Sequence, residues 1–189
     1  MKKILLSAVA VMAFGVAAQA QDIKFGVKAG LNIANQGGDA ETDGSLMGFH
    51  VGGVAELKIS ETFSVQPEVL YSMMGAKYKD LGVETDLKMS YINVPILAKY
   101  YLMEGLSLEA GPYVGFLMSA KAEDTDVKDG YKSIDFGLAG GVAYDLPMGV
   151  FFQARYMAGL SDINDTEAEI GSTPKITNNA IQVSVGYKF

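Results

Sequence analysis

The amino-acid sequence predicts an all-β protein: an eight-stranded antiparallel up-and-down transmembrane β-barrel, preceded by a cleaved signal peptide. Three observations lead to this prediction. Apolar and polar residues alternate along eight segments, each segment is longer than a typical strand of a soluble domain, and the connections alternate between short and long. After residue 20 no apolar run reaches the length of a spanning helix, so a membrane crossing would use strands.

The first twenty residues have the pattern of a secretory signal peptide. Lys2 and Lys3 supply a charged start, an apolar run extends over residues 4–18, and Ala18-Gln19-Ala20 provides the small residues that precede a cleavage site. The run is too short for a stable spanning helix, so we expect cleavage rather than an uncleaved anchor. The chain therefore divides into a signal peptide, residues 1–20, and one barrel domain, residues 21–189.

Composition and charge exclude several classes of function. Without Lys2 and Lys3 the chain has 13 basic and 22 acidic side chains, and this net charge of −9 argues against binding nucleic acid. The chain has no cysteine, which excludes disulfides and thiolate metal sites. We expect no cofactor and no metal, and we expect a monomer.

Period-two alternation is clearest in the C-terminal segment. One face carries Ile181, Val183, Val185, Tyr187 and Phe189, and the other carries Gln182, Ser184, Gly186 and Lys188. Every segment is long enough for the roughly nine to eleven tilted residues that cross the apolar core of a bilayer. The eight segments are Lys24–Ala34, Leu46–Ile59, Thr62–Ala76, Lys88–Leu102, Leu106–Ala120, Lys132–Leu146, Val150–Ser161 and Ile176–Phe189.

The connections between these segments alternate between tight turns and long polar loops. The turns are Ile59–Thr62, Met103–Gly105 and Leu146–Gly149. The loops, which are mostly acidic, are Asn35–Ser45, Lys77–Leu87, Lys121–Tyr131 and Asp162–Lys175. Outer-membrane barrels pair short periplasmic turns with longer external loops, so the pattern predicts both termini in the periplasm and four loops outside the cell.

Period two also fits a soluble calycin-like barrel with an apolar cavity, so the two faces must be assigned. The polar face carries full charges in mid-strand: Lys28, Glu56, Glu68, Lys99, Glu109, Asp135 and Arg155. In a soluble barrel these charges would face water and the apolar face would line the cavity. In a membrane barrel the charges face the lumen and the apolar face meets lipid.

Three features favour the membrane barrel. Aromatic residues gather toward strand ends, as interfacial girdles require; they are Phe25, Phe63, Tyr71, Tyr100, Tyr101, Tyr144, Phe152, Tyr187 and Phe189. The charged face is rich in glycine, as the concave side of a small barrel requires; these are Gly26, Gly30, Gly48, Gly52, Gly111, Gly115, Gly137 and Gly141. The last strand also ends on an aromatic residue, Phe189.

Three prolines, Pro67, Pro95 and Pro112, lie inside predicted strands. A closed barrel has no free edge, so each proline forfeits one ladder hydrogen bond. A β-bulge is one way to accommodate such a proline, and periodicity alone does not resolve how these three are tolerated.

No set of residues points to catalysis. His50 is the only histidine and falls on the lumen side by parity, and the late strands lack the Ser–His pair that a lipid A hydrolase needs. The lumen of an eight-stranded barrel is only wide enough for side chains to fill it, so buried charges there must pair with one another. We interpret His50 as a hydrogen-bonded structural residue and the lumen charges as a salt-bridge network, which also argues against a porin-like channel.

Four stretches of the chain have a recognisable combined pattern: Phe25–Asn32, Gln66–Ser72 with Gly75–Lys77, Tyr91–Tyr100 and Leu108–Gly115. They resemble the PorT-like outer-membrane β-barrel family of Bacteroidetes, and the resemblance covers essentially all of Gln21–Phe189. It implies an eight-stranded barrel, inserted by an outer-membrane assembly machinery that reads the final strand; Gly186–Phe189 looks like that signal. The resemblance implies little about activity, although the founding member is associated with type IX secretion and gliding.

We therefore predict a non-enzymatic integral protein of the bacterial outer membrane, with a side-chain-filled lumen and a structural or surface-interaction role. A link to secretion or envelope assembly would be one form of that role. Its expected partners are outer-membrane lipids, the assembly machinery and an extracellular partner that the sequence does not identify. Two alternatives stay open at this stage. One is a soluble lipocalin-like carrier of an apolar ligand, and the other is a lipid-modifying outer-membrane enzyme.

Overall fold

The computed structural model describes residues 22–39, 42–80, 83–165 and 174–189. The predicted signal peptide, residues 1–20, lies outside the described residues. Among the described residues, no helix has the length and apolar character needed to span a membrane. The elements are β1 Asp22–Gly38, β2 Gly44–Lys58, β3 Phe63–Asp80, β4 Val83–Tyr101, β5 Leu106–Ala122, β6 Thr125–Asp126, the 3-10 helix η1 Lys128–Gly130, β7 Ile134–Asp145, β8 Val150–Gly159 and β9 Ile176–Lys188.

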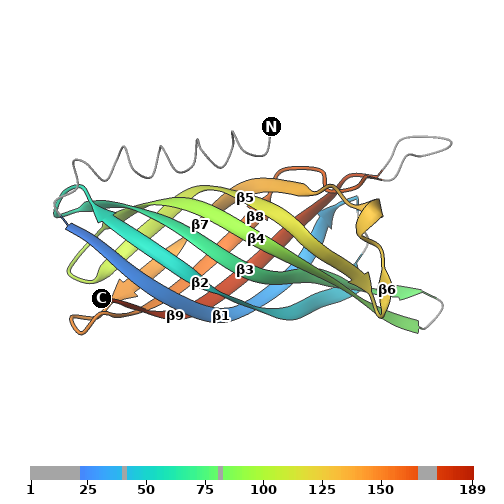
Figure 1. Ribbon diagram of the computed structural model, residues 1–189, viewed down its shortest axis with the longest axis horizontal. Helices are drawn as coiled ribbons and strands as arrows, with labels where there is room; N and C mark the ends of the chain where they lie inside the picture. The colour runs from blue at the N-terminus through green and yellow to red at the C-terminus, as the bar shows by residue number, and fades with distance from the viewer. Residues whose placement is uncertain (1–21, 40–41, 81–82, 166–173) are drawn as a thin grey trace.

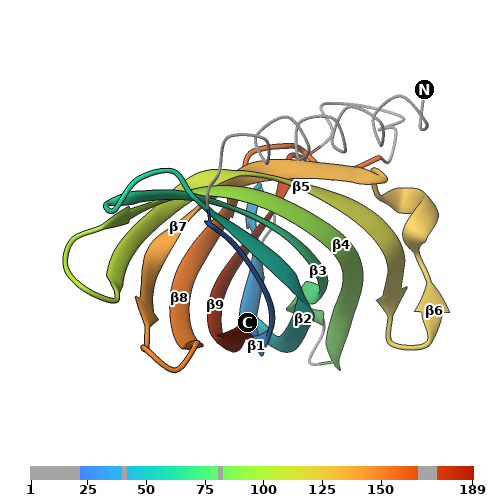
Figure 2. The same cartoon turned by 60° about the vertical axis from the view of Figure 1, so that its left-hand side comes forward.

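Eight strands form a closed antiparallel ring (Figures 1 and 2). Each pairs with its neighbours in the order β1, β2, β3, β4, β5, β7, β8, β9, and β9 pairs with β1 to close the ring. The short strand β6 lies outside this ring and pairs only with the end of β5. The predicted eight-stranded up-and-down barrel is confirmed, and closure leaves no unpaired edge along the ring.

The two ends of the barrel differ, and we name them by their connections. At the turn end, where Phe189 lies, tight turns join β2 to β3, β4 to β5 and β7 to β8 (Figure 1). Gly105 and Gly149 occupy the left-handed region there, with φ of 79° and 91°, which glycine adopts without a steric penalty. The loop end carries the four other connections.

Two of the four predicted loops are largely strand. β1 continues to Gly38 and β2 begins at Gly44, and the β3–β4 hairpin extends to Asp80 and Val83. The physical reason is that beyond the apolar band the outward side chains, such as Asn35 and Lys77, are polar, and the buried inward side chain of Gln36 is polar too. No apolar–polar alternation therefore marks these residues, while the backbone groups still pair. In the other two predicted loops, the described residues between strands of the ring contain only β6 and η1.

The prolines sit in β3, β4 and β5 without a β-bulge at any of the three positions. The shifts of register lie elsewhere, between Ser45 and His50 in β2 and between Ser90 and Tyr91 in β4. Beside each proline the ladder instead skips two pairs and resumes in the same register, because the flanking pairs hold the strands together. The skipped stretches lie between Val54–Glu68 and Leu57–Val65, between Pro67–Ile96 and Leu70–Asn93, and between Pro95–Tyr113 and Ala98–Ala110.

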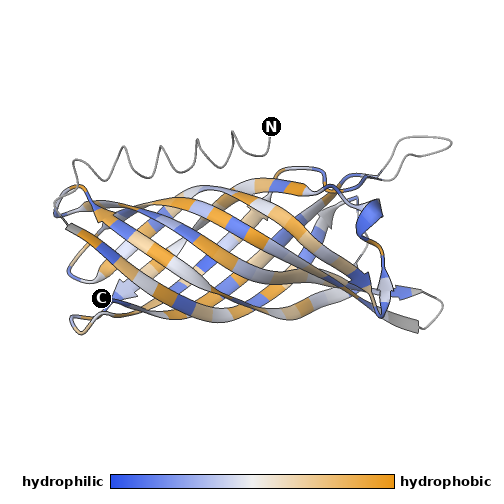
Figure 3. Cartoon of the chain, in the orientation of Figure 1, coloured by the Kyte–Doolittle hydropathy of each residue, from blue (hydrophilic) through white to orange (hydrophobic). Residues whose placement is uncertain are grey.

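The apolar face points outward and the polar face points into the barrel. Val183, Leu138 and Phe136 are more than half exposed, whereas Gln182, Asp135 and Arg155 are buried. Figure 3 shows the resulting alternation of hydrophobic and hydrophilic residues along the strands. This arrangement contradicts the lipocalin-like alternative, in which the apolar face would line an internal cavity, and it is the arrangement that lipid requires.

Candidate functional site

The lumen holds every charge that parity had placed there. All seven predicted lumen charges are at most 6 % exposed: Lys28, Glu56, Glu68, Lys99, Glu109, Asp135 and Arg155. Six of them form two separate networks, one in the middle of the barrel and one at the turn end, and Asp135 lies apart toward the loop end. The eight predicted glycines on this face are also close to neighbouring strands; for example, a Cβ on Gly48 would lie 2.3 Å from the Met73 carbonyl oxygen.

The central network consists of Lys28, Glu68, Glu109, Gln153 and Arg155. Lys28 Nζ lies 2.8 Å from Glu68 Oε2 and donates to Gln153 Oε1 at 2.6 Å. Arg155 Nη2 donates to both oxygens of Glu68, at 2.8 and 3.0 Å. Arg155 Nε lies 3.3 Å from Glu109 Oε1, and Gln153 Nε2 donates to Glu109 Oε2 at 2.5 Å.

Charge balance explains why this network is tolerated. The network contains two cations and two carboxylates, so its net charge is zero. The side chains of all four residues are completely buried. An unpaired charge would cost several kcal/mol in such surroundings, whereas each charge here has an opposite charge within 3.3 Å. The predicted salt-bridge network is confirmed in the middle of the lumen.

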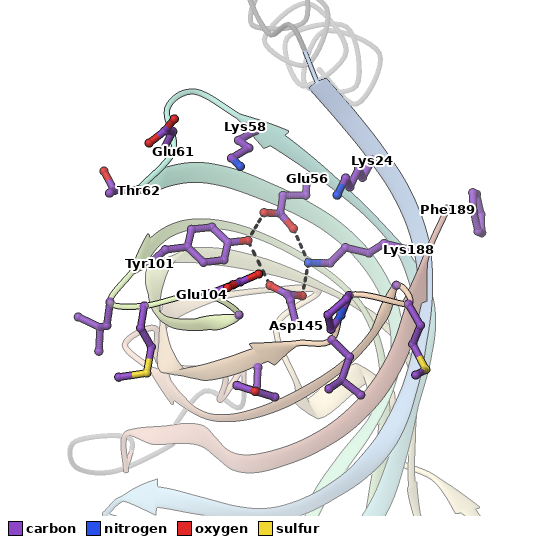
Figure 4. Close-up of a pocket in the computed structure, with 18 residues that line it drawn as sticks. Lys24, Glu56, Lys58, Glu61, Thr62, Tyr101, Glu104, Asp145, Lys188 and Phe189 are labelled. Carbon is purple, nitrogen blue, oxygen red and sulfur yellow. Dashed lines mark hydrogen bonds and ion pairs between the residues drawn. The ribbon is translucent and has the colours of Figure 1, made fainter.

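The turn-end network fills the lumen at the turn end and is built from Glu56, Lys99, Tyr101, Asp145 and Lys188. Figure 4 shows four of these residues, without Lys99. Lys99 Nζ donates to Asp145 Oδ2 at 3.0 Å and lies 3.6 Å from Glu56 Oε2. Lys188 Nζ contacts both carboxylates, with 2.5 Å to Asp145 Oδ1. Two cations again balance two carboxylates.

Tyr101 is the one predicted girdle residue that points into the lumen instead of toward lipid. Its hydroxyl donates to Glu56 and lies 3.1 Å from Asp145 Oδ2 (Figure 4). Adjacent residues of a strand face opposite sides, so Tyr100 and Tyr101 cannot both belong to the girdle. Because Lys99 faces the lumen, Tyr101 must do so as well; the parity of Lys99 was the signal that would have given the correct assignment.

A cavity of about 930 Å³ opens from this network to the outside at the turn end. Its rim carries Lys24, Lys58, Glu61 and Glu104, and its floor is the turn-end network (Figure 4). The floor residues already satisfy one another. We therefore interpret the cavity as the open end of a filled barrel and not as a ligand-binding site.

His50 lies in the lumen, as parity predicted. Its Nδ1 is 2.8 Å from Asn32 Oδ1 and its Nε2 is 2.7 Å from Ser184 Oγ. Asn32 is held in turn by Ser72, whose Oγ accepts from Asn32 Nδ2 at 2.9 Å. Both ring nitrogens are thus engaged in a buried hydrogen-bond chain, which fits a structural role.

The loop-end part of the lumen contains an apolar cluster, which the predicted polar lumen did not include. A buried cluster there comprises Ala34, Met74, Leu87, Met89, Tyr91, Leu117, Ala120, Ile163 and Ala180. The signal was again parity in β4, where every second residue before Lys99 faces inward. Within this region Asp135 has no cation among the described residues and accepts instead from Ser161 Oγ at 2.5 Å and Asn178 Nδ2 at 3.1 Å.

The segment after β8 places Ile163 over this apolar cluster. Asp162 Oδ1 accepts from the backbone N–H of Ile176 at 2.9 Å and of Asn164 at 3.1 Å. The Ile176 bond is the main reason that the pKa of the Asp162 carboxyl lies below its ordinary value, with Asn164 and Lys132 acting in the same direction. Because a lowered pKa means that folding favours the carboxylate, this anchor is present at neutral pH and is lost as the pH falls through the lowered pKa.

No group of three or more histidine, cysteine, aspartate or glutamate residues within the described part of the chain is arranged to hold a metal ion. The family comparison then decides the classification. A family model described as "Outer membrane protein beta-barrel domain" matches residues 18–165. The chain belongs to this outer-membrane β-barrel family. Membership places the protein in a bacterial outer membrane, in agreement with the outward apolar face.

Solved structures share the fold of this outer-membrane barrel at low sequence identity. Neisserial surface protein A is 20 % identical with a TM-score of 0.62, over 89 % of this chain and 100 % of its own. Ail of Yersinia pestis, solved with the heparin analogue sucrose octasulfate, is 14 % identical with a TM-score of 0.52, over 89 % and 100 %. OprG of Pseudomonas aeruginosa is 16 % identical with a TM-score of 0.50, over 88 % and 95 %. No curated protein matches the chain.

Proposed function

We propose that this outer-membrane barrel is non-enzymatic and has a structural or surface-interaction role, with both termini in the periplasm and the loop end outside the cell. The observation that carries the proposal is the filled lumen. Two charge-neutral networks and an apolar cluster occupy it along its length. Since the interior is occupied, the surface at the loop end is what remains for contact with a partner.

An enzymatic role would require polar groups that are free to act on a substrate. Glu56, Glu68 and Glu109 are each paired with a lysine or arginine. His50 contacts the Ser184 hydroxyl, but the two residues are only 0 % and 4 % exposed, so a substrate cannot reach them. These contacts favour the non-enzymatic role over the lipid-modifying enzyme. A comparison of lipid A mass spectra with and without the gene tests this choice, because an enzyme would change the spectrum.

We also propose that the chain is a PorT-like member from Bacteroidetes, inserted as a monomer by the assembly machinery through Gly186–Phe189. The motifs Gln66–Ser72, Tyr91–Tyr100 and Leu108–Gly115 support the subfamily, and each contains one of the three prolines that lie on adjacent strands. A role in secretion or envelope assembly would follow from that kinship.

The orientation is testable with single cysteines, because the chain has none of its own. Asp129→Cys places a thiol in η1 at the loop end, and Met148→Cys places one in the β7–β8 turn; both positions are exposed. On intact cells, a membrane-impermeant maleimide is expected to label D129C and to leave M148C unlabelled until the outer membrane is permeabilised. Labelling of M148C but not D129C on intact cells would show the opposite orientation.

A further inference from the structure

Two lysines face each other across the outer surface of the barrel near the loop end. Lys88 of β4 and Lys121 of β5 are direct partners in the antiparallel register. Both are exposed, while the neighbours Leu87, Met89 and Ala120 are buried in the lumen. Because side chains alternate along a strand, both lysines point outward from the barrel wall.

Like charges directly opposite each other on one sheet face destabilise the pair. Compensation within the protein is weak: Asp86 lies 3.9 Å from Lys88 and 3.9 Å from Lys77, at the limit of an ion pair. The ammonium group of Lys121 has no hydrogen bond or ion pair among the described residues. Its cross-strand neighbour Asp126 instead accepts from the Lys128 backbone N–H at 3.0 Å.

Further cations surround this pair. Lys77 is on the neighbouring strand β3, and Lys128 reaches back to donate from Nζ to the Met118 carbonyl oxygen of β5 at 3.0 Å. We call Lys77, Lys88, Lys121 and Lys128 the lysine patch. Three carboxylates lie beside the patch, on Asp86, Asp126 and Glu123, and Glu123 Oε1 accepts from the Asp86 backbone N–H at 2.9 Å. The four lysines therefore keep an excess of one positive charge, on a protein whose net charge is −7.

The lysine patch lies directly beyond the lipid-facing band. One step toward the turn end, Ser90 pairs with Ser119, and the Tyr71 hydroxyl donates to Ser90 Oγ at 2.9 Å. The next outward pair is Ile92 with Phe116, which belongs to the apolar face. Tyrosine with its hydroxyl turned toward the polar side marks a membrane interface, so the lysines stand at the depth of lipid headgroups.

We propose that the lysine patch binds the phosphate of a phosphorylated glycolipid in the outer leaflet, with Lys88 and Lys121 sharing one phosphate group. This rests on the proposed orientation, which puts the loop end outside the cell. Cross-strand Cβ atoms are about 5 Å apart, so two ammonium groups can donate to the same phosphate oxygens and their mutual repulsion is relieved. The acyl chains then lie along the apolar outer face that continues from the lysine patch toward the turn end, around Ile92 and Phe116. This adjacent apolar surface favours a lipid over free phosphate.

The test compares binding of diphosphoryl lipid A to the folded barrel in neutral detergent micelles, measured by native mass spectrometry. The double variant Lys88→Gln/Lys121→Gln is expected to bind about tenfold more weakly than the natural protein. Lys24→Gln/Lys58→Gln removes the same charge at the turn end and is expected to leave the affinity unchanged. Inorganic phosphate, added in place of lipid A, is expected to show no specific binding.

The outcomes separate this proposal from the one on which it rests. Equal binding by both double variants and the natural protein, or equal losses in both, would overturn the lysine patch as a lipid site. Binding of inorganic phosphate as strong as that of lipid A would show an anion site without lipid specificity, which also overturns it. If the proposed orientation is wrong, the labelling pattern of D129C and M148C on intact cells will be reversed. That result does not depend on lipid A binding.

Discussion

Replacing Arg155 with methionine is expected to lower the free energy of unfolding by about 3–5 kcal/mol, because it leaves a buried negative charge without its partner. Arg155 holds both Glu68 and Glu109 in the middle of the lumen. Lys28 alone cannot neutralise two carboxylates. The change is measured by urea unfolding in phospholipid vesicles, followed by the heat-dependent gel shift because the chain has no tryptophan.

The matched control for this prediction removes one charge of each sign. Arg155→Met combined with Glu109→Gln leaves Lys28 paired with Glu68, and the network stays neutral. We expect this double variant to recover most of the stability lost in R155M. If the double variant is as unstable as the single one, loss of packing rather than uncompensated charge is responsible, and the electrostatic account of the lumen is wrong.

Alanine at Gly52 is expected to destabilise the barrel by about 3 kcal/mol or to prevent folding, because the barrel wall is too tightly curved there for a side chain. A Cβ on Gly52 would lie 2.0 Å from the Val69 carbonyl oxygen and 2.8 Å from Leu70 Cα. Backbone atoms of the next strand cannot move aside as a flexible side chain can. The fraction of protein that refolds into vesicles, read from the gel shift, measures the effect.

The neighbouring residue provides the control. Gly53 faces outward, and the nearest atom to its Cβ position, the Gly26 carbonyl oxygen, is 3.9 Å away. Gly53→Ala is therefore expected to fold as the natural protein does. Equal damage from both substitutions would mean that backbone freedom in β2, and not the space on the concave face, is what glycine provides.

The architecture was predictable because one physical constraint acts along every strand. The outer face must be apolar in lipid, and the inner face must pack polar groups in a narrow lumen. Each strand therefore appears as one alternating segment that can be counted, and parity within the segment gives the direction of each side chain. Parity alone therefore assigns the side chains of four residues to one interior: Lys28, Glu68, Glu109 and Arg155. Their pairing followed from the cost of burying a charge alone.

The strand extensions, the tolerated prolines and the apolar cluster depend on contacts between strands. The alternation of residues within one segment gives no information about such contacts. The strand extensions at Asn35–Gly38 and Lys77–Asp80 were missed because the outward side chains there are polar and the buried inward Gln36 is polar as well, so side-chain polarity does not alternate although the backbone pairs. The prolines need no bulges because adjacent pairs keep the register. The apolar cluster at the loop end forms from residues of six segments, among them Met74, Leu117 and Ile163.

The central claim is that side chains fill the lumen, and single-channel recording in planar lipid bilayers tests it most directly. Folded, purified protein is inserted at increasing amounts, and the current under an applied voltage is compared with that of the bare bilayer and of heat-denatured protein. We expect no discrete conductance steps, since two neutral ion networks and an apolar cluster occupy the interior. Regular steps whose number rises with the amount of folded protein would show an open pore and contradict this account.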